Sequence, residues 1–102
     1  MGNDVVPSQV DWCRVAVQLQ HDPEALPWRE RISLLAQHAE AFASPTDEML
    51  AVLDGLAGDA KWEVRRQVAE LLAQVPEEAF HRLGARLTED QNSYVRKAAE
   101  RS

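Results

Sequence analysis

Hydrophobic positions recur along this chain with helical spacing, and prolines and glycines separate the segments that carry them. The clearest stripe lies in segment 60–75, where apolar residues follow one another at i, i+4, i+7, i+8 and i+11. These are Val64, Val68, Leu71, Leu72 and Val75. This spacing places all five on one face of a helix. Because the alternation typical of strands is scarce, the pattern predicts an all-α fold.

Two helices are predicted before the first clear break in the chain. The first covers 8–20, with Ser8 as its N-cap and Asp11 three residues later as a partial capping box. Its apolar residues, Cys13 among them, cover more than half of the helix circumference, so we expect neighbours on more than one side. A proline then begins a long second helix over 28–43.

The later helices begin at polar caps or prolines. These start signals are Ser44 with Pro45, then Asp59, then Pro76, and finally Asn92 or Ser93. Because every connection is too short for a crossover, consecutive helices are expected to pair antiparallel. The sequence therefore predicts one domain of three helix pairs, over 8–43, 44–75 and 76–102.

The second half of the chain repeats itself when it is shifted by 31 residues. The shift lays Leu56 on Leu87, Asp59 on Asp90, Val64 on Val95 and Arg65 on Arg96. A helix pair of this length cannot bury its apolar face alone, so repetition indicates pairs that stack on one another. A weaker third copy is predicted at Leu19, Asp22 and Trp28-Arg29, with one extra residue.

These repeated residues resemble the HEAT repeats, in which each helix pair has an Asp at the turn and Val-Arg near the start of the second helix. The resemblance is specific over 47–102. It implies a short right-handed α-solenoid, a HEAT/armadillo-like superhelix of about three stacked helix pairs. Asp59 and Asp90 can cap the second helix of their own pair and accept from a guanidinium of the adjacent pair. The resemblance implies that Arg65 and Arg96 are the donors of this ladder.

Segments 59–65 and 92–101 are similar to bacterial repeat modules that stand in front of histidine-kinase-like ATPase regions. The nucleotide-binding motifs of the ATPase are not in this sequence. The resemblance implies a sensing or docking part of a bacterial signalling system, or a stand-alone relative of one.

The second helices of HEAT-like arrays line the concave side, which implies a binding groove. The residues expected there are Trp62, Glu63, Arg66, Glu70, Tyr94, Lys97 and Arg101. One interpretation is a solvated face whose charges pair along the helix. The other is an anchor for a peptide or protein, since Trp, Tyr and Arg supply most interface hot spots. The predicted function is a non-catalytic protein-interaction or scaffold module.

Two other partners stay open. A phosphate-backbone binder similar to the HEAT-like DNA-alkylation-repair proteins would use Arg65, Arg66, Arg82, Arg86, Arg96, Lys97 and Arg101. Acidic neighbours interrupt that patch, and the net charge of −6 disfavours nucleic acid. The last buried stripe is incomplete at Ser102, which predicts either a continuing chain or self-association through an open C-terminal edge.

Catalysis and cofactor binding are not predicted. The three histidines, His21, His38 and His81, lie on separate segments without metal-ligand spacing. Cys13 lies in an apolar helix face, where a lone thiol is expected to be a small core residue. Trp12 and Trp28 are expected in the core as well. With no membrane span and no signal peptide in the sequence, a cytoplasmic location is expected.

Overall fold

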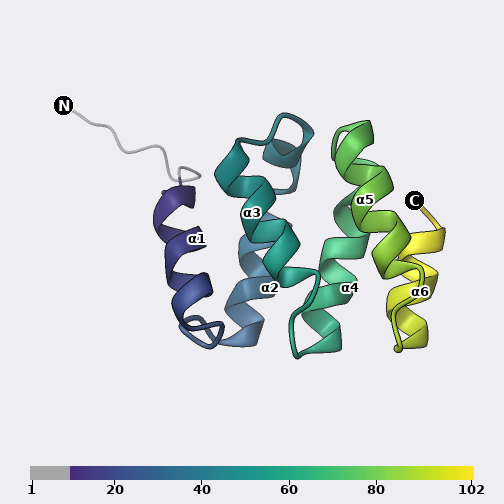
Figure 1. Ribbon diagram of the computed structural model, residues 1–102, viewed down its shortest axis with the longest axis horizontal. Coiled ribbons are helices and arrows are strands. Elements are labelled where there is room, and N and C mark those ends of the chain that lie inside the picture. The colour runs from purple at the N-terminus through teal and green to yellow at the C-terminus, as the bar shows by residue number, and fades with distance from the viewer. Residues whose placement is uncertain (1–9) are drawn as a thin grey trace.

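The computed structural model describes residues 10–102, and this part of the chain is all-helical, without strands. The α-helices are α1 (Trp12–His21), α2 (Trp28–Gln37), α3 (Asp47–Leu56), α4 (Trp62–Glu70), α5 (Glu77–Leu87) and α6 (Ser93–Glu100). Two short 3₁₀ helices, η1 (Ala39–Ala43) and η2 (Leu71–Ala73), follow α2 and α4. The helices form two rows, with α1, α3 and α5 in one and α2, α4 and α6 in the other (Figure 1). The prediction of a short all-α solenoid is confirmed.

The core lies between the two rows and runs through the successive helix pairs. All five residues of the predicted stripe in 60–75 are buried there. The second row is in close contact along its length, because α4 packs against both α2 and α6. Val95 and Leu83 extend this core into the last pair. The second row therefore holds the repeats together.

Two helix starts differ from the predicted ones. The described part of α1 is capped by Asp11, whose Oδ1 accepts from the backbone N–H of Arg14 at 3.1 Å. The predicted cap, Ser8, lies outside the described residues. In α3 the cap is Thr46 rather than Ser44, because the Thr46 hydroxyl accepts from the third residue of the helix at 3.2 Å. Ser44 and Thr46 are both residue types that favour an N-cap, so the sequence around Pro45 does not distinguish between them.

The predicted long helix over 28–43 is wrong. The α-helix ends at Gln37, and His38 leaves helical geometry with φ −115° and ψ 23°. The chain then tightens into η1, which turns Phe42 fully into the core. Its ring meets Trp12 edge-on with centroids 5.3 Å apart. The free energy gained by burying the Phe42 ring in the first pair thus outweighs that of continuing the α-helix.

The packing of the first helix is narrower than predicted. Helix α1 packs on α3 and holds no fully buried residue. Trp12 and Leu19 lie against the core, whereas Val17 is 49% exposed. Cys13, expected to be a core residue, is exposed. Of the apolar residues of α1, Cys13 and Val17 therefore face solvent, whereas the others are partly buried.

Candidate functional site

Each turn between paired helices is organised by an aspartate. The carboxylate of Asp22 accepts from the backbone N–H of Glu24 at 3.0 Å. Asp59 and Asp90 form the same bond to the residue two positions later, each at 2.9 Å. Asp59 thus orders the turn before α4 rather than occupying its N-cap position, which falls on Lys61. The repeated Asp is therefore a turn-forming residue first.

Two of these aspartates also bind an arginine of the preceding helix pair. Arg31 Nη2 donates to Asp59 Oδ2 at 3.2 Å, and its Nε lies 3.1 Å from Asp59 Oδ1. Arg65 donates to both oxygens of Asp90, at 2.7 Å from Nε and 3.1 Å from Nη2. Such two-point contacts fix orientation as well as distance. The pairs join neighbouring turns.

The same arginines hold the turn of their own pair. Nη1 of Arg65 donates to the Asp59 carbonyl at 2.7 Å, and Nη1 of Arg31 donates to the Pro23 carbonyl at 2.7 Å. Arg96 donates to the carbonyl of Asp90 at 2.7 Å. Within residues 10–102, Arg96 contacts no aspartate of a further turn. Each bridging arginine therefore ties one turn to the next.

The sequence placed the arginine of the first copy two residues too early. Arg29, the predicted residue, lies over the ring of Trp28 at 5.0 Å from its centroid. Arg31 takes the ladder position, three residues after the tryptophan that begins its helix, as Arg65 follows Trp62. Aligning the two tryptophans, which are 34 residues apart, would have identified Arg31 as the equivalent of Arg65.

The environment of Asp90 changes its acidity. Burial raises the pKa of its carboxyl, but hydrogen bonds from Arg65 and from the Asn92 backbone, with the positive charges of Arg65 and Arg96, outweigh this. The net result is a pKa below the ordinary value. The ionised form is therefore the one that the fold stabilises.

Asp90→Asn is expected to reduce the acid sensitivity of the domain. Because the pKa of Asp90 is lower in the folded than in the unfolded chain, its contribution is complete well above the unfolded value of about 3.9 and is lost as the pH falls below it. Urea unfolding at about pH 6 and about pH 3 should show a smaller difference in the variant than in the wild type. A Glu78→Gln control should retain the wild-type difference, and an equal difference in all three proteins would contradict this role.

The predicted groove residues lie mainly on α4. Trp62, Glu63, Arg66 and Glu70 line a cavity of about 320 Å³ together with Gln67 and with Ile32 of α2. Arg66 and Glu70 form an exposed ion pair at 3.1 Å. The structure therefore brings four predicted residues to one cavity. The contribution of α2 was missed, because its repeat register was misplaced.

Helix α6 contributes to this surface through one ring. Tyr94 is 59% exposed and stacks on Trp62, with centroids 5.4 Å apart and an interplanar angle of 24°. Lys97 on α6 and Arg101, directly after the end of α6, are exposed but do not line the cavity. The predicted set is thus divided into a compact group around Trp62 and two separate cations.

One atom of the cavity lacks a partner. Oε1 of Glu63 is buried and accepts no hydrogen bond from residues 10–102. A buried carboxylate oxygen without a donor is costly, by about 1–3 kcal/mol or more. This oxygen is enclosed by the protein itself and is not open to a group in the cavity.

The basic residues proposed for phosphate binding are largely engaged. Arg65 pairs with Asp90, and Arg66 with Glu70. Arg82 lies 3.1 Å from Asp54, whose carbonyl also accepts from Arg86. These contacts withdraw guanidinium groups from a phosphate-binding surface. In the described part of the chain, no group of three or more His, Cys, Asp or Glu side chains is placed to hold a metal.

Comparison with known proteins identifies the architecture. A family model for HEAT repeats matches residues 15–102. No curated protein and no solved structure matches the chain. Among the described helices, none has the length and apolar character to cross a bilayer. With paired helices in two rows and an arginine–aspartate ladder between the turns, the chain belongs to the HEAT-repeat family.

Proposed function

We propose that this chain is a non-catalytic protein-interaction module whose partner binds the Trp62 surface, which we define as Trp62, Glu63, Arg66, Glu70 and Tyr94. The observation that carries the proposal is the exposed ring of Tyr94, stacked on the half-buried Trp62 beside the cavity. HEAT repeats are commonly interaction scaffolds. A stacked array presents an extended binding surface without a conformational change. Lys97 lies on the neighbouring α6 and Arg101 directly follows it, and both are proposed as rim contacts.

The chemistry of this surface supports a protein partner. Tyr94 offers a large ring that is already held by Trp62, so little side-chain entropy is lost when a partner covers it. Opening the Arg66–Glu70 pair would supply a further donor and acceptor at the edge.

Tyr94→Ala and Arg66→Glu are expected to weaken partner binding by tenfold or more while leaving the fold intact, since both side chains are exposed. The wild-type chain and each variant are immobilised, and proteins retained from an extract of the source cell are identified. Val17→Ala is the matched control, because among residues 10–102 Val17 is the other large exposed hydrophobic side chain, and it lies on α1. Equal helicity by circular dichroism is required of all four proteins. Retention of the same proteins by wild type and both variants would contradict the proposal.

A docking role in a cytoplasmic bacterial signalling system rests on the sequence resemblance of 59–65 and 92–101. It is a finer form of the same proposal. Its signature in the capture experiment is a retained histidine-kinase-like ATPase that the Tyr94→Ala variant loses.

Self-association through the C-terminal edge is supported by one observation. Arg96 holds its own turn as Arg65 does, but within the described residues no next aspartate receives it. Asp22 forms the repeated turn and accepts no guanidinium from residues 10–102. The two ends of the ladder are therefore complementary. Retention of the chain by its own immobilised copy would identify this mode of association.

A further inference from the structure

A second cavity, larger than the one beside Trp62, lies between the first two helix pairs. It measures about 460 Å³ and is formed by the C-terminal halves of α1 and α3 with the loops that follow them. The volume falls in the range of small-molecule and side-chain pockets. Its lining residues are Ala16, Leu19, Gln20, Pro23, Glu24, Ala51, Val52, Gly55, Leu56, Gly58, Asp59 and Ala60. None of them belongs to the Trp62 surface.

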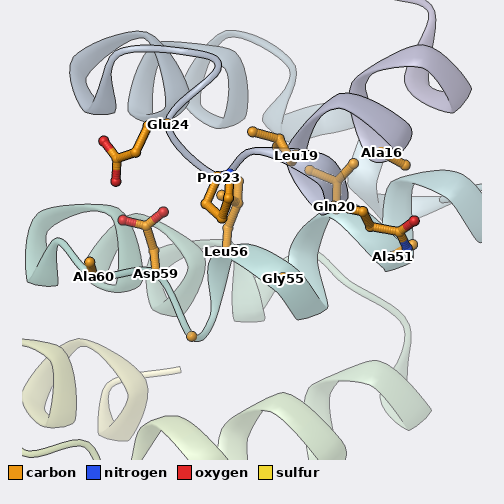
Figure 2. A pocket seen from close by; sticks show the side chains of 12 residues that line it. Ala16, Leu19, Gln20, Pro23, Glu24, Ala51, Gly55, Leu56, Asp59 and Ala60 are labelled. Atoms are coloured by element: carbon orange, nitrogen blue, oxygen red, sulfur yellow. The ribbon is translucent and has the colours of Figure 1, made fainter.

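The cavity has an apolar part and a carboxylate end. Figure 2 shows Ala16 and Ala51 toward one end of the lining, and the carboxylates of Glu24 and Asp59 toward the other. On the α3 side of the cavity there is open space above Gly55, where a Cβ would meet no atom within 4 Å. An apolar group can therefore enter between α1 and α3 without displacing the protein.

The two carboxylates differ in what they can still bind. Asp59 is buried and occupied by Arg31 and by the backbone N–H of Lys61. Glu24 is exposed and forms no ion pair with any of residues 10–102. Among the residues that the structure describes, no other charged side chain lines the cavity. The cavity therefore combines an apolar interior with one available negative charge at its rim.

We infer that this cavity binds a peptide segment of a protein partner, in which a large apolar side chain is followed by lysine or arginine. The apolar side chain fills the space over Gly55, and the basic side chain pairs with Glu24. Charge complementarity selects the basic residue, because the cavity presents no cation to an acidic segment. This site is separate from the Trp62 surface and extends the proposed interaction to the other row of helices.

The test uses two blocked tetrapeptides, acetyl-Leu-Phe-Lys-Arg-amide and acetyl-Leu-Phe-Glu-Glu-amide, titrated into the isotope-labelled chain at low salt. Backbone amide signals are followed by NMR. The basic peptide is expected to shift the amides of Ala16, Ala51 and Gly55 at lower concentrations than the acidic peptide does. Glu24→Gln should weaken binding of the basic peptide by about two- to fivefold, as expected for an exposed ion pair.

Gly55→Leu should abolish these shifts by filling the cavity. The variant should melt no lower than the wild type, because leucine favours the helix and meets open space there. Ala85→Leu, an exposed substitution on α5, and Glu78→Gln, an equal charge change that does not line the cavity, are the matched controls and should bind normally.

Three results would overturn the inference: no shift at the cavity with the basic peptide, equal affinity for the acidic peptide, or unchanged binding in Gly55→Leu. Tyr94→Ala should leave the peptide shifts intact. Failure at this cavity is therefore distinguishable from failure of the Trp62 surface.

Discussion

Val68→Asp is expected to unfold the domain. Val68 lies in the last turn of α4, is fully buried, and faces the core between the two rows of helices. The substitution removes the burial of a valine side chain, about 1.5–3 kcal/mol, and adds a carboxylate with no cation beside it. The total exceeds about 4–5 kcal/mol, which is most of the stability of a domain of this size. Because α4 contacts both α2 and α6, one charge there disturbs all three pairs.

Circular dichroism and urea unfolding measure this effect. The matched control is Gln67→Asp, which places the same charge one residue earlier on the half-exposed side of the helix. That variant should lose no more than about 1 kcal/mol, through helix propensity. If Val68→Asp unfolds cooperatively with nearly the same urea midpoint as Gln67→Asp, then the stripe does not form the core.

The core was predictable from sequence because it depends on local spacing. The 3.6-residue period of Val64, Val68, Leu71 and Leu72 identifies one helix face, whatever that face packs against. Burial of all four follows the pattern, although α4 gives way to η2 before the stripe ends. A change to 3₁₀ geometry moves a side chain by a fraction of a turn, which the periodicity of a short segment does not resolve.

The first helix pair was predicted poorly because its loop breaks the repeat. The 31-residue offset describes the second and third pairs, but α2 follows α1 through a longer loop that ends at Pro27. Alignment by Asp22 therefore chose Arg29 as the ladder residue, whereas alignment by the helix start chooses Arg31. When a loop changes length, the helices still pack in the same way, but the residue offset between repeats no longer holds.

The two cavities depend on contacts that no local pattern carries. The cavity beside Trp62 needs Ile32 from α2, and the larger one needs α1 to lie against α3 with Gly55 between them. The sequence identified Trp62 and Tyr94 as candidate anchors through their residue types. Their stacking, and the empty space over Gly55, follow from how neighbouring pairs are rotated on each other.

Arg31→Ala is expected to destabilise the domain by about 3–5 kcal/mol, the usual cost of removing one partner of a buried ion pair. Arg31 is the largest fully buried side chain, and Asp59 is buried beside it. Without the guanidinium, the Asp59 carboxylate stays buried with one backbone N–H from Lys61. The Pro23 carbonyl loses its donor too. Thermal unfolding should shift down by about 15 °C or more.

Two comparisons separate the ladder from charge loss in general. Arg82→Ala removes a guanidinium whose partner, Asp54, is half-exposed, and should cost no more than about 1 kcal/mol. Asp59→Asn in the Arg31→Ala background removes the buried charge but keeps an acceptor for Lys61, so the double variant should be more stable than Arg31→Ala alone. Equal losses for Arg31→Ala and Arg82→Ala, or a double variant weaker than the single one, would mean that the buried pair is not what joins the first two turns.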